Sequence, residues 1–100
     1  MKPLRFDWDT ANAAANRRKH GVAFSEAQTV FLDDEALLLA DPEHSDLEDR
    51  FILLGLSATL RMLVVVHAYR GTDGVFRLIS ARKANRREQR VYADQGHGSD

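Results

Sequence analysis

The sequence contains no cysteine, only two prolines among its 100 residues, and no apolar run long enough to cross a bilayer. The absence of cysteine excludes disulfides, thiolate metal sites and a cysteine nucleophile. Apolar runs such as Leu63–Val66 are far shorter than the roughly 20 residues of a membrane helix. Residues 1–5 lack the apolar stretch of a secretion signal. We therefore expect a cytoplasmic protein that does not enter a membrane.

The length of the chain limits the number of domains. A chain of this size buries roughly two thirds of its unfolded surface, which is enough for one modest hydrophobic core. We predict a single domain over residues 1–93. Residues 94–100 contain nothing apolar to bury, so we expect them to form a flexible polar tail.

Charge is strongly segregated along the chain, although the net charge is only −1. Between residues 33 and 49 there are eight acidic residues and no Lys or Arg. Residues 17–19 are Arg-Arg-Lys, and residues 82–90 hold five cations against one carboxylate, Glu88. Of the 14 cations 11 are arginine, the residue suited to bidentate contact with phosphate. This clustering keeps nucleic-acid binding open for a protein of near-neutral pI.

Two helices are predicted in the first third of the chain. Asp9 or Thr10 is placed to cap a helix over residues 11–19. Gly21 is placed to end that helix, because glycine readily adopts the left-handed conformation that follows a last turn. Residues 25–32 begin with Ser-Glu-Ala-Gln, a capping-box pattern, and predict a second helix.

The rest of the chain indicates a sheet and one more helix. A capping-box pattern from Asn85 to Glu88 predicts a short C-terminal helix. Successive hairpin connections favour an antiparallel sheet of four to five strands, with the two N-terminal helices on one face. The second face of such an α+β domain is available to a ligand or partner. The expected strands are residues 5–8, 35–40, 50–56, 60–68 and 75–80.

Arginines near the C-terminus allow two interpretations each. Arg77 alternates with apolar residues of its strand, so it is either a rim residue paired with an acid or a phosphate-facing cation. Arg86 and Arg87 fall in the first turn of the last helix, where the helix dipole disfavours cations. They belong either to a solvated charged face or to an anion-binding site.

Histidines and the acidic loop give weaker signals. Lys19 and His20 suit the C-terminus of the first helix, although His20 is also a candidate for proton transfer near neutral pH. We expect His67 to be a partly buried structural residue, and His44 and His97 to be solvated. No spacing of these side chains matches a known metal site, so we expect no metal and no cofactor.

Cleavage of RNA needs no metal when the substrate's own 2′-hydroxyl attacks the adjacent phosphate. The enzyme then orients the backbone, assists two proton transfers and stabilises the added negative charge. Arginines, a lysine and a histidine or tyrosine suffice for these tasks. The sequence supplies such a set in Arg50, Arg77, Arg82, Lys83 and Tyr92.

Six short motifs follow one another in a recognisable order. They are Phe6-Asp7-Trp8-Asp9, Asn16-Arg17-Arg18-Lys19-His20-Gly21-Val22, Asp41-Pro42, Glu48-Asp49-Arg50-Phe51, Leu63-Val64-Val65-Val66-His67 and Ile79-Ser80-Ala81-Arg82-Lys83-Ala84. Together these motifs resemble the BrnT family of toxins, over about residues 5–92. One departure is Asn12, where the family has a lysine.

The resemblance implies a RelE-like fold and an endoribonuclease that inhibits translation. It also implies a BrnA-type antitoxin that covers the toxin in a complex of two toxins and two antitoxins, with operator DNA bound only through the antitoxin. By position, the residues implied for catalysis are Arg50, Arg77, Arg82, Lys83 and His20. The residues implied for RNA binding are Lys19, Arg86, Arg87 and Tyr92.

Two other functions fit the same arginine clusters. A non-catalytic binding module would hold RNA or an acidic protein and would cut nothing, while its binding would still weaken with salt. A degenerate toxin would survive only as the corepressor within an antitoxin–DNA complex. Loss of RNA cleavage in an Arg77→Ala or Arg82→Ala variant would distinguish the ribonuclease from both.

Overall fold

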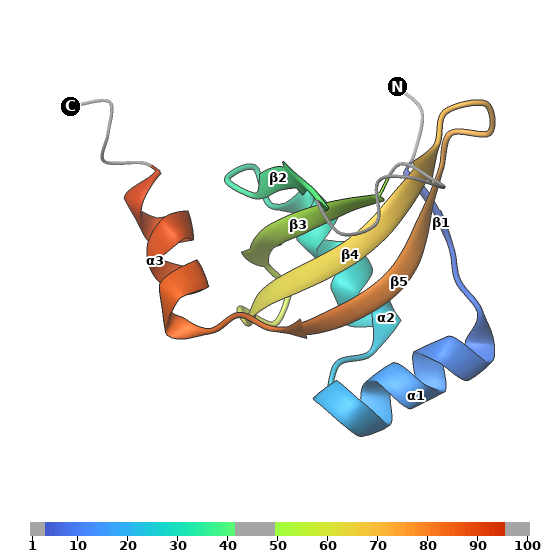
Figure 1. The fold of residues 1–100 in the computed structure, drawn as a ribbon, viewed down its shortest axis with the longest axis horizontal. Helices are drawn as coiled ribbons and strands as arrows, with labels where there is room; N and C mark the ends of the chain where they lie inside the picture. The colour runs from blue at the N-terminus through green and yellow to red at the C-terminus, as the bar shows by residue number, and fades with distance from the viewer. Residues whose placement is uncertain (1–3, 42–49, 96–100) are drawn as a thin grey trace.

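The computed structural model describes residues 4–41 and 50–95, which form an α+β fold (Figure 1). The predicted strands and helices are all found within this part of the chain, with small differences at their ends. In chain order they are β1 (Arg5–Asp7), α1 (Thr10–His20), α2 (Phe24–Ala27), the 3-10 helix η1 (Gln28–Leu32), β2 (Leu37–Ala40), β3 (Arg50–Leu56), β4 (Met62–Arg70), β5 (Val75–Lys83) and α3 (Arg86–Asp94).

The sheet is mixed, so the prediction of a wholly antiparallel sheet was wrong at one strand. Strands β2 to β5 pair antiparallel with their neighbours in sequence, as expected from hairpin connections. The strand order is β1-β5-β4-β3-β2, and β1 pairs with β5 in parallel. Because β1 pairs with a strand about 70 residues away, no turn signal in the sequence specifies its direction.

Local capping signals predicted both ends of α1 and the start of α3. The Asp9 side chain accepts a hydrogen bond from the backbone N–H of Asn12 at 3.0 Å. Gly21 follows α1 with φ of 70°, and its N–H donates to the carbonyl of Arg17. Asn85 and Glu88 form the predicted capping box reciprocally, with bonds of 2.8 and 2.9 Å.

The capping box predicted at Ser25 was wrong. Helix α2 begins one residue earlier, at Phe24, and its N-cap Ala23 provides no side-chain hydrogen bond. Phe24 is 2% exposed, so burial of its ring decides where the chain turns into the helix. Glu26, the expected reciprocal partner, instead accepts hydrogen bonds from Ser57, Thr59 and Arg61.

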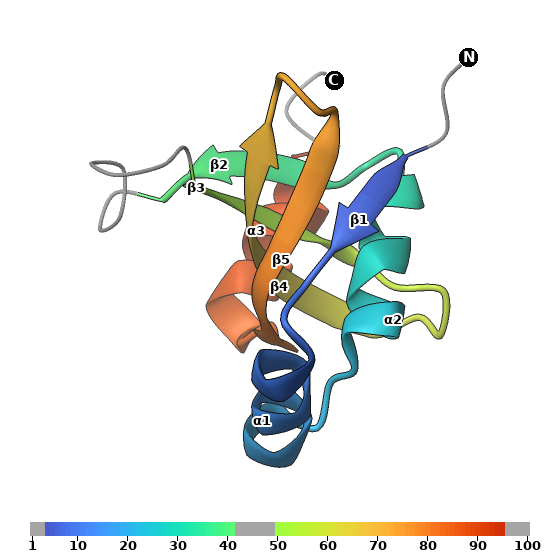
Figure 2. The same cartoon turned by 90° about the vertical axis from the view of Figure 1, so that its right-hand side faces the viewer.

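Helices lie on both faces of the sheet, whereas the sequence predicted helices on one face and left the position of the last helix open. On the face we call the α2 face, residues of α2 and η1 pack with Leu53, Val65 and Leu78. On the opposite face, the α3 face, Tyr92 packs with Leu54, Val64 and neighbouring side chains. Adjacent strand residues such as Leu53 and Leu54 point to opposite faces, which explains the two separate cores. Figure 2 shows the sheet between α2 and α3.

Helix α1 lies against the part of β5 that β1 leaves uncovered. The buried Asn16 side chain bonds both backbone groups of Ala81, donating to its carbonyl at 2.9 Å and accepting from its N–H at 3.0 Å. The same amide donates to the carbonyl of Val22. Asn16 therefore acts as one residue of a neighbouring strand and closes this edge of the sheet.

The C-terminal helix extends slightly into the predicted tail. Helix α3 ends at Asp94, and the Gln95 side chain donates to the carbonyl of Glu35. The rest of that predicted tail, residues 96–100, lies outside the described residues, as do His44 and His97. No helix within residues 4–41 and 50–95 has the length and apolarity needed to span a membrane.

Candidate active site

Two of the arginines singled out from the sequence lie in one row across the α3 face. Arg50 on β3 and Arg77 on β5 both pair with Ala68 of the intervening strand β4. Because paired residues of neighbouring strands point to the same face, the two side chains flank Ala68. Two strand spacings separate their backbones, about 10 Å. Long arginine side chains can span that distance from both sides to reach a single phosphate.

A β-bulge in β5 places Arg82 on this face as well. Val66 pairs with Ser80 but His67 pairs with Leu78, so Ile79 is an extra residue without a partner on β4. Arg82 pairs with Val64, which belongs to the core of the α3 face. Arg77 and Arg82 lie about 15 Å apart along the strand. An extended nucleic-acid strand that runs along β5 can therefore contact both side chains through neighbouring phosphates.

Arg82 is held by a carboxylate from α3. Its two terminal nitrogens donate to the two oxygens of Glu88 at 2.9 and 2.8 Å. The hydrogen bonds to Arg82 lower the pKa of Glu88, while burial acts to raise it. The same pairing raises the pKa of Arg82. Both side chains therefore stay charged across the physiological range of pH.

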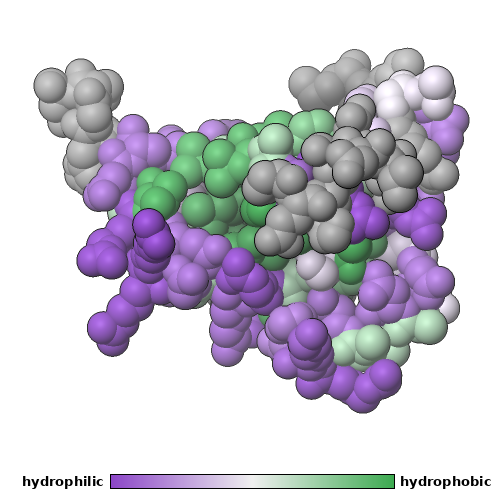
Figure 3. All heavy atoms as spheres, in the orientation of Figure 1, coloured by the Kyte–Doolittle hydropathy of each residue, from purple (hydrophilic) through white to green (hydrophobic). Residues whose placement is uncertain are grey.

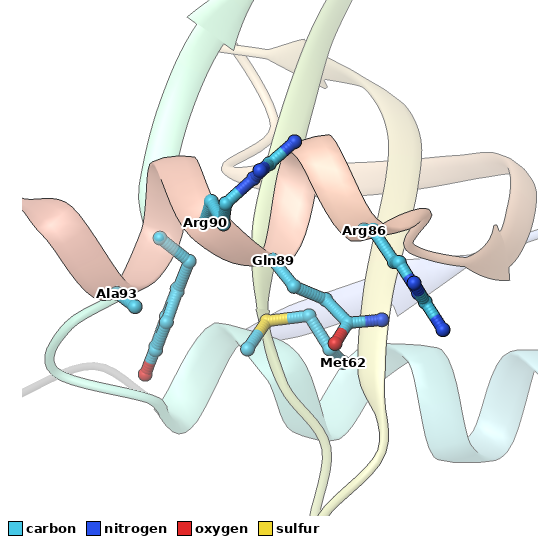
Figure 4. Close-up of a pocket in the computed structure, with 6 residues that line it drawn as sticks. Met62, Arg86, Gln89, Arg90 and Ala93 are labelled. Atoms are coloured by element: carbon cyan, nitrogen blue, oxygen red, sulfur yellow. The ribbon is translucent and has the colours of Figure 1, made fainter.

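More arginines lie on α3 itself. Arg86, Arg87 and Arg90 are exposed. Beside α3 a groove of about 710 Å³ opens towards the start of β4 (Figure 4). In Figure 3, hydrophilic atoms over α3 adjoin apolar surface over β2, where Leu38 and Leu39 are exposed. The groove is lined by Met62, Arg86, Gln89, Arg90, Tyr92 and Ala93.

Tyr92 uses its hydroxyl to anchor α3. The hydroxyl donates to the Asp33 carboxylate at 2.8 Å, and burial together with this bond raises the pKa of Tyr92 to about 12. Burial acts to raise the pKa of Asp33, but backbone N–H groups of Leu56 and Glu35 and the Tyr92 hydroxyl lower it overall. Tyr92 therefore lines the groove while its hydroxyl bonds Asp33.

The structure separates the remaining candidates from the three arginines. Lys83 pairs with Leu63 and follows Ala81 by two residues, so its side chain points to the α2 face. Lys19 and His20 end α1, whose Ala13 also packs on that side. Strand β5 extends three residues beyond the predicted end, and its alternation places Lys83 opposite to Arg82.

His67 has the structural role expected from the sequence, and it is more deeply buried than predicted. It is 1% exposed and lies among the rings of Phe31, Phe51 and Phe76. Burial lowers its pKa, and a hydrogen bond with the carbonyl of Val65 opposes that shift only in part. A neutral histidine in an aromatic cluster fills the core and takes no part in the arginine site.

Comparison with known proteins identifies the family. Residues 8–88 match the family described as the ribonuclease toxin BrnT of type II toxin–antitoxin systems. The chain belongs to the BrnT family. The match includes the three arginines of the α3 face and Glu88, and leaves out Tyr92.

A solved structure shows the same fold. The chain is similar to the 1.1 Å crystal structure of the Brucella abortus ribonuclease toxin BrnT, with a TM-score of 0.63 and 22% sequence identity. The similarity covers 84% of this chain and 100% of that one. No curated protein matches the sequence. The mixed five-stranded sheet with its three α-helices, described here for residues 4–41 and 50–95, is thus a BrnT fold.

Sequence reasoning missed Glu88 as part of the site. In the sequence, Glu88 stands out only as the acidic half of a helix cap and as the one carboxylate among the cations of residues 82–90. Its spacing of six residues from Arg82 crosses the junction between β5 and α3, where no helical or strand periodicity applies. Only the turn of the chain at Ala84 and Asn85 brings the two charges together.

Proposed function

We propose that this BrnT-family chain is the toxin of its type II system and cuts RNA without a metal, by attack of a 2′-hydroxyl on the adjacent phosphate. Such cleavage inhibits translation, as in RelE-like endoribonucleases. The observation that supports the proposal is the presence of Arg50, Arg77 and Arg82 on one sheet face. A surface of this kind orients a phosphate backbone and stabilises the charge that develops on it.

Roles follow from these positions. Arg50 and Arg77 hold the scissile phosphate from both sides and stabilise its additional negative charge in the transition state. Arg82 binds a neighbouring phosphate of the same strand, with Arg86 and Arg87 adding positive potential at the start of α3. The 2′-oxygen forms a bond to phosphorus as it loses its proton, and the 5′-oxygen leaves as it gains one. The products carry a 2′,3′-cyclic phosphate and a free 5′-hydroxyl.

Proton transfer is the part of this mechanism that the arginines do not supply. His20, with Lys19, remains our candidate for that step, and Lys83 for a further phosphate contact. Because these residues belong to the α2 side of the sheet, RNA must pass around the edge of the sheet for them to act. An unchanged cleavage rate in a His20→Ala variant would remove His20 from the mechanism.

A type II toxin has an antitoxin partner. We propose a BrnA-type protein in a complex of two toxins and two antitoxins, with operator DNA bound through the antitoxin. The arginine face is a suitable surface for an acidic segment of that partner, because a carboxylate can occupy the positions that phosphates take in RNA.

Expression of the toxin in growing bacteria tests this function. Induction of the wild-type chain should arrest growth with loss of total RNA, and Arg77→Ala should abolish both effects. Arg18→Ala removes another exposed arginine, on α1, and serves as the matched control. Absence of arrest with a folded, soluble wild-type chain would contradict the ribonuclease function and favour a binding or corepressor role.

A further inference from the structure

Glu88 makes two different sets of contacts. Its side chain accepts a hydrogen bond from the backbone N–H of Asn85 at 2.9 Å, which completes the cap of α3. Its two carboxylate oxygens also bind Arg82, with the closest ion-pair distance at 2.8 Å. The cap requires one acceptor oxygen, and a glutamine provides it equally well. A full negative charge and two oxygens are needed only for the guanidinium.

The Arg82 guanidinium presents N–H groups along three edges, and protein oxygens accept hydrogen bonds along two of these edges. The end that carries Nη1 and Nη2 binds Glu88, and Nη1 also donates to the carbonyl of Lys83 at 3.3 Å. Among the described residues no group bonds the remaining edge, formed by Nε and Nη2. That edge presents two parallel N–H donors, the geometry that binds two oxygens of one phosphate.

We propose that Glu88 is a positioning residue that fixes the Arg82 guanidinium on the α3 face with its Nε–Nη2 edge directed to an RNA phosphate. The proposal rests on the ribonuclease function above and adds a residue to it. An arginine held from the opposite end loses less rotational freedom when RNA binds, so more of the interaction energy remains available in the transition state. Glu88 does not compete with phosphate, because it occupies a different edge.

The test compares three purified chains on one RNA oligonucleotide. Glu88→Gln keeps an acceptor for the cap and removes the charge on which Arg82 depends. Asn85→Ala removes the other half of the capping box, the bond from the Glu88 N–H at 2.8 Å, and leaves the Arg82–Glu88 pair in place. It is therefore the matched control for a merely structural effect of α3.

We expect the Glu88→Gln substitution to affect kcat more than KM. Glu88→Gln should lower kcat by about tenfold to a hundredfold, the usual cost of a misplaced catalytic contact. KM should change by less than kcat, because the more positive surface left by the lost carboxylate offsets part of the binding energy lost with the fixed guanidinium. Asn85→Ala should lower the free energy of unfolding with kcat close to that of the wild type. A kcat in Glu88→Gln equal to that of the wild type, or above it, would overturn the proposal.

A second measurement does not depend on cleavage. The Nε–H resonance of Arg82, assigned through its absence in Arg82→Lys, should shift when a 2′-O-methyl RNA oligonucleotide binds the wild type, and should shift less in Glu88→Gln. If the resonance shifts in this way while the wild type cuts no RNA, the ribonuclease function is contradicted but the role of Glu88 in positioning Arg82 is supported. No shift in the RNA-bound wild type would overturn the positioning role.

Discussion

Arg77 and Arg82 point to the same face of β5 although five residues separate them along the strand. In a regular strand an odd spacing places two side chains on opposite faces. The bulge at Ile79 adds one residue and reverses the alternation, which also places Leu78 and Ala81 together in the core of the α2 face. The Asn12 side chain donates to the carbonyl of Ile79 at 2.8 Å and holds the bulge in place.

The arginine row makes a prediction about coupled variants. Arg50→Ala and Arg77→Ala should each lower kcat for RNA cleavage by about a hundredfold or more, as expected when a donor to the developing charge is removed. The double variant should lose less than the product of the two effects, because both residues act on one phosphate. Single-turnover kinetics measures each loss, with Arg18→Ala as the control. Fully multiplicative losses would show that the two arginines contact different phosphates.

Asn16 makes a prediction about stability. Asn16→Ala should lower the free energy of unfolding by about 3 kcal/mol, because it leaves buried backbone groups of Ala81 without partners. Denaturant unfolding measures the change. Asn12→Ala is the comparison variant, because its single bond to β5 lies at an exposed site and its loss should cost about 1 kcal/mol. Equal losses in the two variants would contradict the role given to burial.

Much of the fold follows from local signals in the sequence. Asp9, Gly21 and Asn85 act within one turn of their helices, so their side chains and backbone preferences predict helix ends without tertiary information. The direction of β1 and the bulge at Ile79 depend on partners far along the chain. Ser25 failed as a cap because the burial of Phe24 outweighed a capping bond of about 1 kcal/mol.

Acid should weaken the link between α2 and the β3–β4 hairpin. Hydrogen bonds from Arg61, and to a smaller extent from Thr59 and Ser57, outweigh the effect of burial and lower the pKa of Glu26 from 4.5 to about 2. A lowered pKa stabilises the fold above the unfolded value of 4.5, and this stability is lost as the pH falls from 4.5 towards 2. Glu26→Gln should cost roughly 2 kcal/mol at pH 7, with the difference from wild type shrinking towards pH 2. A difference that does not depend on pH in denaturant titrations would contradict this account.

Alkali should release α3 from the sheet. The raised pKa of Tyr92, about 12 against 10, favours the protonated phenol in the folded state. This contribution to stability is complete below pH 10 and is lost as the pH rises from 10 towards 12. Tyr92→Phe should therefore be less stable than the wild type by about 1–2 kcal/mol at pH 7 and should lose the alkaline dependence. Ultraviolet absorbance of tyrosinate, compared between the two chains, measures the titration of Tyr92.

The candidate site was only partly predictable. Arg77 stands out in the sequence because an arginine in an apolar strand is rarely buried without a partner. Arg50 and Arg82 were predicted from their residue type and from the resemblance to the BrnT family. Arg77 and Arg82 share a face only because of the bulge in β5. The bond between Arg82 and Glu88 forms only because the chain turns from β5 into α3. Lys83 was predicted to act on phosphate together with Arg82, yet adjacent residues of a strand point to opposite faces.

The mechanism of cleavage is tested most directly by the chemistry of the cut. The purified chain would be incubated in EDTA with an RNA oligonucleotide, and in parallel with the same oligonucleotide methylated at the 2′-oxygen of the cleavage site. We predict cleavage of the first to a 2′,3′-cyclic phosphate and a 5′-hydroxyl, and no cleavage of the second at that site. Cleavage at the methylated position, or cleavage only when a divalent metal is added, would contradict attack by the 2′-hydroxyl on this arginine surface.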